Sequence, residues 1–341
     1  MSDERLLVLV PFRNEQLFLP AFFDALDGIA DQIVGLDDHS SDESATLFRS
    51  LGGHVVDINL PNDWTQGGEV FSRQTLLNAG RDLGGTHFLW LDADEVPSDE
   101  LRRHLRTAIL DLSQGQALEL LWVNAWKDSL HYRRRWLLDD PGYRPFAHAD
   151  IPAAAITGQR LHFPRVPMVT GVQSKRLSKD HGAIIHLQYC NWQRARAKQA
   201  WYQVSERVET SRSPLQIGLR YRDTHHLRLG HLRRMPKAWL ISPSTESSLS
   251  IDESSTDVGR RDSISRSLAL MSEEPIESFE PLDIWDVPEL LAHFECLTGR
   301  PPRPRLIWTP ILYLADALDR TRLTSTATKI LEVLRRILRR P

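Results

Sequence analysis

Residues 6–15 read LLVLVPFRNE, and this segment sets the architecture of the first third of the chain. Leu6 to Val10 is an unbroken apolar run, which is typical of a strand buried on both faces of a sheet. The run ends at Pro11, and residues 17–26 then carry apolar side chains at mixed helical spacing. We therefore expect a buried strand followed by a helix.

The same alternation continues as far as residue 91. Further strands are expected at 32–36, 53–60 and 87–91, and helices at 42–50 and 73–83. Strands that alternate with helices imply an α/β fold, in which helices cover both faces of a mostly parallel sheet. Open sheets of this kind bind ligands outside the carboxyl ends of their strands. Three of the four expected strands run directly into acidic or proline-containing polar clusters, so we expect a ligand site at that edge.

The remainder of the chain is less regular. Between about Leu120 and Gln203, short apolar segments alternate with loops rich in Arg, His and Trp, which suits a region that binds an acceptor. Residues 242–281 are dense in Ser, Glu and Asp with little apolar periodicity, which predicts a mobile loop or linker. The predicted organisation is a domain over 1–230, with its donor half to about 120, and a helical C-terminal extension over 231–341.

Composition excludes several classes of protein. The formal net charge of the 341 residues is −3, which gives no reason to expect a nucleic-acid partner. Cys190 and Cys296 lie far apart and fit no C-x-x-C spacing, so they argue against a zinc cluster and suit a reducing compartment. The sequence shows neither a secretion signal nor a run of about 18 apolar residues. These features predict a cytoplasmic protein.

Residues 89–95, LWLDADE, place acidic side chains two residues apart at the end of an expected strand. That spacing puts Asp92 and Asp94 on the same side of an extended backbone. Such carboxylates suit Mg²⁺ or Mn²⁺, and a divalent cation would stabilise a diphosphate leaving group. For an isolated D-x-D, a simpler interpretation is favoured, in which Asp94 or Ser98 only caps the following helix.

Three motifs, however, occur in order: VLVPFRNE at 8–15, LDDHSSD at 36–42 and LDAD at 91–94. Together they resemble the family 2 glycosyltransferases, whose first strand ends in a P-x-x-N-E turn and whose second ends in D-D-x-S-x-D. The resemblance covers roughly residues 5–105. It implies a GT-A (Rossmann-like) fold and the transfer of a sugar from a nucleotide-diphosphate donor of the UDP or GDP type.

The resemblance also implies a nucleoside pocket. Pro11, Arg13 and Glu15 would line it, and Asp38 would hydrogen-bond the base. Where Arg13 stands, many members of the family carry an aromatic residue, so base stacking here would use a guanidinium plane. The alternative for residues 37–42 is simple helix capping.

For the sugar-diphosphate end of the donor, the resemblance implies a second set of residues. Arg73 would contact the ribose or the diphosphate, while Asp92, Ala93 and Asp94 would hold the ribose and the metal. The alternative for Arg73 is a surface position on a helix.

A narrower resemblance joins D-A-D-E to IHLQY at 185–189, followed by Lys198 and Tyr202. This combination is similar to the lipopolysaccharide-core glucosyltransferases of family 2, which act in the biosynthesis of cell-envelope polysaccharides. It implies that His186 completes the metal or diphosphate site, and imidazole is compatible with Mn²⁺. The alternative is a structural histidine whose partner is a backbone carbonyl. Lys198 is either a diphosphate contact or part of a solvated helix face.

An inverting transferase also needs a carboxylate within hydrogen-bond reach of the acceptor hydroxyl. Related enzymes often carry a His-Glu pair where this sequence reads VQS at 172–174. Asp180, in KDHG ahead of His186, is the candidate base, and a turn former before Gly182 is the alternative. This departure keeps open a second hypothesis, a non-catalytic protein that binds nucleotide sugar or scaffolds a partner.

The tail over residues 329–340, KILEVLRRILRR, has an apolar stripe surrounded by basic side chains. Such a helix either packs on its own domain or lies on an anionic membrane, where a lipid-linked acceptor would be found. The sequence does not choose among a glycan, a lipid-linked or another acceptor. The expected location is therefore the cytoplasm, with peripheral contact at the inner face of the membrane as the second option.

Overall fold

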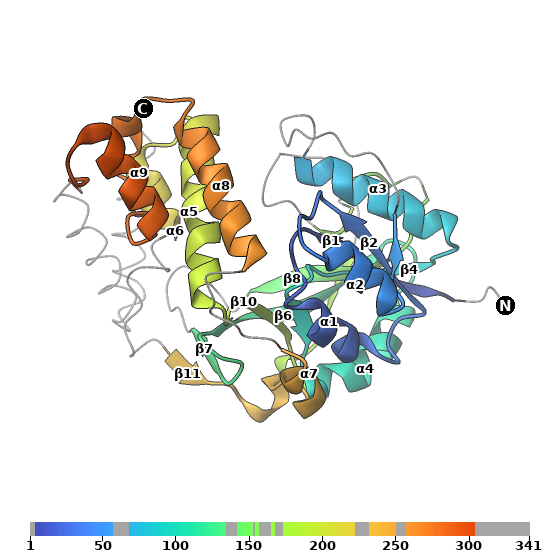
Figure 1. Cartoon of the computed structure of the whole chain (residues 1–341). Helices are drawn as coiled ribbons and strands as arrows, with labels where there is room; N and C mark the ends of the chain where they lie inside the picture. The colour runs from blue at the N-terminus through green and yellow to red at the C-terminus, as the bar shows by residue number, and fades with distance from the viewer. Residues whose placement is uncertain are drawn as a thin grey trace. The chain divides into compact units, whose positions relative to one another are not determined.

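The computed structural model describes residues 4–56, 68–133, 142–152, 154–156, 165–167, 173–221, 232–249 and 257–303 (Figure 1). The chain divides into two compact units. Unit 1 comprises Met1–Tyr132, Pro141–Cys190 and Arg234–Ile251, and unit 2 comprises Arg133–Asp140, Asn191–Arg233 and Asp252–Pro341. The division therefore does not fall at residue 230. The chain leaves unit 1 after Cys190 and returns to it from Arg234 to Ile251 before it enters unit 2 again.

The centre of unit 1 is a parallel sheet. Its first four strands are β1 (Leu6–Phe12), β2 (Gln32–Asp37), β3 (His54–Val55) and β4 (His87–Trp90). β1 lies between β2 and β4 and is parallel to both, with Leu9 opposite Val34 on one side and Trp90 on the other. All five residues from Leu6 to Val10 are fully buried, as the unbroken apolar run predicted.

Further strands extend this sheet. They are β5 (Glu95–Pro97), β6 (Gln116–Trp126), β7 (His131–Arg133), β8 (Tyr143–Ala149), β9 (Gln173–Arg176) and β10 (Ile184–Tyr189). The order along the sheet is β7-β6-β8-β4-β1-β2-β3. Because β8 is antiparallel to both β4 and β6, and β10 is parallel to β6, β6 and β10 run in the same direction as β1. The carboxyl ends of β1, β2, β4, β6 and β10 therefore face the same edge of the sheet.

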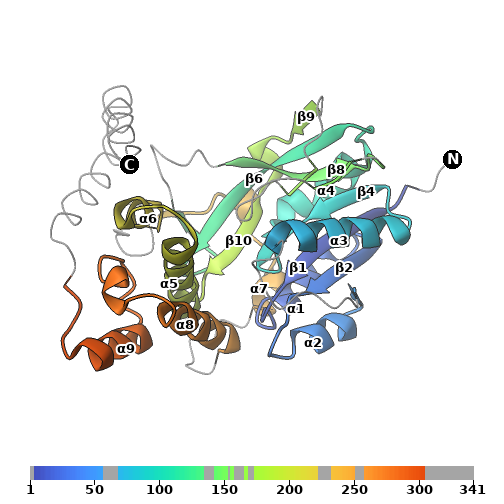
Figure 2. The same cartoon turned by 90° about the horizontal axis from the view of Figure 1, so that it is seen from above.

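Helices cover both faces of this sheet (Figures 1 and 2). In unit 1 they are α1 (Leu19–Leu26), α2 (Ser44–Ser50), α3 (Gly68–Asp82), α4 (Asp99–Leu110) and α7 (Pro243–Ser247), with the 3-10 turns η2 (Lys179–His181) and η5 (Lys237–Trp239). Val8 belongs to a core with Phe22 of α1 and Leu105 of α4, whereas Leu9 belongs to a core with Leu76 of α3. Successive residues of β1 thus point to opposite faces. The expected α/β class is confirmed, and it is the arrangement that the resemblance to the GT-A fold implied.

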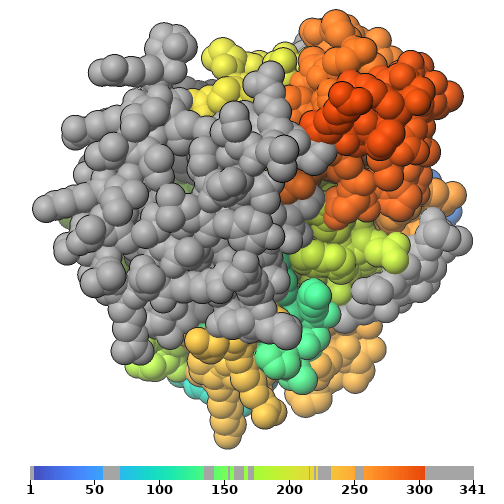
Figure 3. Space-filling model, turned by 90° about the vertical axis from the view of Figure 1, so that its left-hand side faces the viewer, coloured from blue at the N-terminus to red at the C-terminus, as the bar shows by residue number. Residues whose placement is uncertain are grey.

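The described part of unit 2 is largely helical. It contains α5 (Trp192–Glu209), α6 (Pro214–Tyr221), α8 (Val258–Met271), η6 (Ile276–Phe279) and α9 (Pro288–Thr298), and β11 (Leu232–Arg234) spans its junction with unit 1. Ala197 and Ala200 of α5 share a core with Ile264 of α8 and Phe279. In the space-filling view α9, coloured red-orange, lies at the surface (Figure 3).

The prediction of a loop over residues 242–281 is wrong for most of that range, because α7, α8 and η6 lie within it. α8 buries polar as well as apolar side chains, so its core-facing side shows no apolar period. Ser263 and Ser267 are both buried. Their hydroxyls donate to the carbonyl oxygens of Gly259 and Ser263, four residues earlier, so burial leaves neither hydroxyl without an acceptor.

Two expectations concern parts of the chain outside the described residues, namely the helical periodicity from Leu306 and the amphipathic tail at 329–340. In the part that is described, no helix combines the length and the apolar character needed to cross a membrane.

Candidate functional site

The turns that follow β1 and β2 are locked together by side chains of the first two motifs. Asn14 Oδ1 accepts from the backbone amides of Ser41 (2.7 Å) and Asp42 (3.3 Å), and Asn14 N donates to Ser40 Oγ (2.9 Å). Asn14 has φ 53°, in the left-handed region that Asn tolerates better than most residues. The Asn of the first motif is therefore explained by structure, since it joins two strand ends.

Helix capping accounts for only part of the second motif. Asp37 Oδ1 accepts from Ser40 N (3.1 Å), and Asp42 Oδ1 accepts from Ser44 N (2.9 Å), so these two carboxylates do hold local turns. Asp38 differs, because its side chain lies against the ring of His39, with Oδ1 3.4 Å from Nδ1. The capping interpretation thus does not cover Asp38.

The predicted nucleoside residues lie together at the carboxyl edge. Pro11 is opposite Leu36 in the β1–β2 register. Arg13 Nη1 donates to the carbonyl oxygen of Asp38 at 2.8 Å, and Glu15 is buried at the start of the turn. The structure therefore brings Pro11, Arg13, Glu15 and Asp38 to the ends of two adjacent strands.

The acidic turn after β4 is tightly held. Glu95 is fully buried, and its Oε2 accepts from Asp92 N at 2.9 Å. Ala93, between the two aspartates, is also buried. Ser98 is the residue that caps α4, because its Oγ accepts from Leu101 N at 3.3 Å. Capping of this helix thus does not explain Asp94.

Asp94 faces His186. His186 Nε2 lies 3.4 Å from Asp94 Oδ2, and both side chains are largely buried. Leu187 N donates to Asp94 O at 2.7 Å, which ties the acidic turn to β10. The other ring nitrogen of His186, Nδ1, lies 2.7 Å from Asn124 Oδ1 of β6. One partner of the His186 ring is therefore a side-chain amide.

This geometry fits a divalent cation. An amide oxygen only accepts, so Asn124 assigns the proton of a neutral His186 ring to Nδ1 and leaves a lone pair on Nε2, beside the Asp94 carboxylate. Such a pair of electron donors could hold a metal ion, and an imidazole with an oxygen ligand suits Mn²⁺. Among the described residues, no group of three or more His, Cys, Asp or Glu is placed to hold a metal. Asp94 and His186 would thus be two protein ligands of an ion that takes the others from water or a phosphate.

Arg73 is buried on α3 and does not occupy a surface position. Its side chain is 4% exposed, and Nη2 lies 3.5 Å from Asp92 Oδ1. Its guanidinium also lies over the ring of Trp90, 5.9 Å from the centroid. Arg73 therefore joins the group of side chains around the acidic turn.

Arg165 is a member of this group that sequence reasoning missed. Its Nη2 donates to Asp92 Oδ2 (2.8 Å) and to Glu95 Oε1 (2.7 Å), and its Nη1 donates to Glu95 Oε2. The guanidinium lies 4.9 Å from the centroid of the Phe146 ring. No motif surrounds residue 165, so its contact with the acidic turn is visible only in three dimensions.

The two guanidiniums set the charge of the turn. Burial alone would raise the pKa of Asp92, but Arg165 and, to a smaller extent, Arg73 outweigh it and hold this pKa below its usual value. Burial acts to lower the pKa of Arg165, and the charges of Asp92 and Glu95 reverse that effect and raise it. Asp92 is therefore an ionised acceptor held between two cations.

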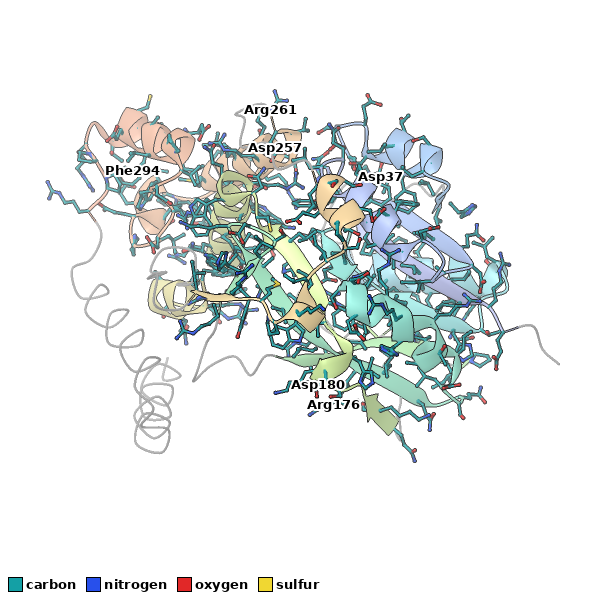
Figure 4. The ribbon with its side chains drawn as sticks, turned by 90° about the horizontal axis from the view of Figure 1, so that it is seen from below. Asp37, Arg176, Asp180, Asp257, Arg261 and Phe294 are labelled. Atoms are coloured by element: carbon teal, nitrogen blue, oxygen red, sulfur yellow. The ribbon has the colours of Figure 1, made fainter. Side chains whose placement is uncertain are left out.

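Asp180, the candidate base, does not join this group. It lies in η2, ahead of the amino end of β10, and is exposed beside Ser178. Because β10 runs in the same direction as β1, its amino end faces the opposite edge of the sheet from Asp38 and Asp92. Figure 4 shows the separation of Asp180 from Asp37. Lys198 and Tyr202, the other two residues of the narrower resemblance, lie on α5 of unit 2, where the ring of Tyr202 stacks against Tyr221.

No protein-family model matches this sequence, and no curated protein matches it. Among solved structures, a mycobacterial protein is 18% identical with a TM-score of 0.29, over 36% of this chain and 42% of its own. Glucosyl-3-phosphoglycerate synthase from Mycobacterium tuberculosis, in complex with Mn²⁺, UDP and glucosyl-3-phosphoglycerate, is 21% identical with a TM-score of 0.27, over 37% of this chain and 45% of that one. This chain thus spans less than half the length of the structures it matches. At TM-scores this low, the similarities carry no argument about its function.

Proposed function

We propose that this protein is a glycosyltransferase that moves a sugar from a nucleotide-diphosphate donor of the UDP or GDP type, with a divalent metal and with inversion at the anomeric carbon. The observation that carries the proposal is the Asp94–His186 pair, 3.4 Å apart, at the carboxyl edge of a mostly parallel sheet. Ligands bind outside this edge in open α/β sheets.

Each neighbouring group has a task that its environment supports. Asp92 remains ionised between Arg73 and Arg165, so it can accept hydrogen bonds from the hydroxyl groups of a ribose. Asp38 and Arg13 lie at the neighbouring strand ends, where a base would follow the ribose. Arg73 offers positive charge to the diphosphate.

A bound Mn²⁺ would supply Lewis-acid stabilisation of the negative charge on the departing diphosphate. Asp94 and His186 would hold it, and Asn124 would keep the proton of His186 on Nδ1.

The proposal assigns no catalytic base. Asp180 is at the far edge of the sheet, so it is not carried forward in that role. For the acceptor we propose a chemical class, namely a glycan or a lipid-linked saccharide of the cell envelope, as the resemblance to the lipopolysaccharide-core subgroup suggested. A cytoplasmic location, with or without peripheral membrane contact, belongs to the same proposal.

The test is a binding and hydrolysis experiment. Titration calorimetry of UDP and of GDP, each with and without Mn²⁺, should show one nucleotide that binds at least about tenfold more tightly with the metal. Incubation with the matching nucleotide sugar and Mn²⁺ should release free sugar slowly, because transferases leak to water. Failure of both nucleotides to bind would refute the proposal. Metal-dependent binding with no sugar release would instead favour the non-catalytic nucleotide-sugar-binding protein.

A further inference from the structure

Arg165 makes more contacts with the acidic turn than a single ion pair would require. Its guanidinium contacts both Asp92 and Glu95, and its side chain is only 17% exposed. Asp92 therefore has one oxygen near Arg165 and the other near Arg73, since Oδ2 takes the first contact and Oδ1 the second. Asp94, two residues further on, faces an imidazole instead.

We propose that Arg165 is a positioning residue that keeps Asp92 out of the ligand set of the metal and aims it at the donor. This inference rests on the proposed function, which already assigns Asp94 to the metal and Asp92 to the ribose, and it adds that Arg165 maintains this difference between the two aspartates. The D-x-D pair would then act through Asp94 on the metal and through Asp92 on the hydroxyl groups of the donor. The arginines beside both oxygens of Asp92 would repel a cation at this carboxylate, whereas a neutral hydroxyl group can still donate to its remaining lone pairs.

Arg165 is also connected to His186, the second proposed metal ligand, through two intermediate side chains. Glu95 Oε1 accepts from Arg165 Nη2 and also from Trp122 Nε1, each at 2.7 Å. The Trp122 ring stacks on His186, with centroids 5.0 Å apart and planes inclined by 28°. Arg165 thus orients the carboxylate that holds the indole against which His186 lies. Through Glu95 and Trp122, Arg165 is therefore connected to His186, one of the two proposed metal ligands.

If Arg165 has this role, its removal should change the affinity for the metal and the affinity for the nucleotide in opposite directions. Removal of the guanidinium takes one positive charge from the site and releases Asp92, so Mn²⁺ alone should bind more tightly. The same change removes charge that a diphosphate needs and frees the carboxylate that is aimed at the donor, so the nucleotide should bind more weakly. A residue with a purely structural role would weaken both.

The experiment compares wild type with Arg165→Met and Arg165→Lys. Mn²⁺ binding is followed by electron paramagnetic resonance of the free ion, and nucleotide binding by calorimetry with whichever of UDP and GDP the wild type binds. For Arg165→Met we expect Mn²⁺ affinity to rise about threefold or more, and nucleotide affinity in saturating Mn²⁺ to fall about tenfold. Arg165→Lys, which keeps the charge but not the bidentate geometry, should return Mn²⁺ affinity to within about twofold of wild type and recover part of the nucleotide affinity.

The matched control is Arg81→Met. Arg81 is also a partly buried arginine of unit 1 in a bidentate pair, with Asp150, and it donates further to the carbonyl oxygens of Ile151 and Ala154. We expect this variant to lose thermal stability and to keep its Mn²⁺ affinity within about twofold.

Two results would overturn the inference: a parallel loss of Mn²⁺ and nucleotide affinity in Arg165→Met, or no change in either. Circular dichroism of each variant shows whether it is folded, and if Arg165→Met does not fold, Arg165→Gln takes its place with the same expected signs. A wild-type protein that binds neither Mn²⁺ nor nucleotide would contradict the proposed function itself, and the two failures are therefore distinguishable.

Discussion

Buried charges gather in both units of this protein, and the two clusters are built differently. In unit 2 one carboxylate, Glu206, is almost fully buried and is surrounded by donors. Its Oε1 accepts from the Tyr221 hydroxyl at 2.8 Å and lies 3.2 Å from Arg220 Nε, and its Oε2 lies 3.2 Å from Arg212 Nη1. Burial, and then the charge of Glu206, raise the pKa of Tyr221 above its usual value, so the phenol stays protonated as a donor.

Around the acidic turn of unit 1, by contrast, carboxylates outnumber the arginines that contact them. Three carboxylates, those of Asp92, Asp94 and Glu95, occur within four residues, and the two arginines contact the first and the third. Asp94 faces the imidazole ring of His186. One cluster thus neutralises its acid with its own cations and has a structural purpose, namely to hold α6 on α5. The other concentrates acid at a strand end, which suits a ligand that brings positive charge.

Among the substitutions that test this difference between the clusters, Asp94→Asn should have the largest effect. Asparagine keeps the shape of the side chain but removes the charge that would bind the metal, so we expect turnover to fall about 10³-fold. The stability of the fold should change little, since asparagine fills the same buried space and keeps an oxygen that accepts hydrogen bonds. Turnover with a nucleotide-sugar donor and the midpoint of thermal unfolding are the two measurements.

Asp24→Asn is the control for that prediction. Asp24 is also an aspartate of unit 1, but its carboxylate accepts from Thr245 Oγ1 and Ser244 Oγ and connects α1 to α7. Its replacement should lower stability and leave turnover within about twofold. Full activity of Asp94→Asn in the presence of EDTA would rule out the proposed role of the metal.

The opposite pattern is expected for Glu206. Glu206→Leu leaves the Tyr221 hydroxyl without its acceptor, and we expect a loss of about 2–3 kcal/mol in the free energy of unfolding. Glu206→Gln, which keeps an acceptor, should lose about 1 kcal/mol. Urea unfolding measures both, and Mn²⁺ binding should be unchanged. An altered Mn²⁺ affinity would show that the two clusters are not separate in function.

The sequence predicted some parts of this fold and site and missed others, depending on whether the interacting residues are adjacent in the chain. The strands of the parallel core were predicted correctly because a strand buried on both faces needs an unbroken apolar run, as in Leu6 to Val10. The acidic turn was found because its residues are adjacent in the chain. Arg165 was not found because its partners lie about 70 residues away in the sequence.

The helix α8 escaped prediction for another reason. Its buried side includes Arg260 and Ser267, whose polar groups bond to Glu289 and to a backbone carbonyl, respectively. Hydrophobic periodicity cannot identify a face that is buried through hydrogen bonds. The candidate base was misplaced for a third reason: Asp180 is close to His186 along the chain, but η2 precedes β10 and so lies toward the amino ends of the parallel strands, away from the carboxyl edge.

A smaller effect is expected where the first motif supports the site without taking part in its chemistry. Asn14→Ala removes the acceptor of two backbone amides and places alanine at φ 53°, so we expect a loss of about 2 kcal/mol in stability. Asn14→Asp keeps the acceptor and should lose less than about 1 kcal/mol. Denaturant unfolding gives both values. Equal losses in the two variants would contradict the account of the interlocked turns.

The smallest effect concerns a third buried group, which bears no charge. His148 of β8 is 3% exposed and lies against the rings of Phe88 and Trp90, and neither of its ring nitrogens has a hydrogen-bond partner among the described residues. Burial, with the nearby charges of Arg81 and His87, lowers its pKa to about 3. Between the ordinary pKa of 6.5 and this value the unfolded chain binds a proton that the folded protein does not, so stability falls as the pH falls through that window.

This contribution can be isolated by difference. From pH 6.5 to 5.5, above the range in which most carboxylates titrate, His148 should account for a loss of about 1 kcal/mol in the free energy of unfolding. His148→Phe removes the titrating ring and keeps an aromatic packing partner, so its stability should fall by that much less over the same interval. Urea unfolding at the two pH values measures the difference. Identical pH dependence in wild type and variant would mean that His148 takes up its proton as readily in the folded protein as in the unfolded chain, and therefore that its ring is not sealed from water by Phe88 and Trp90.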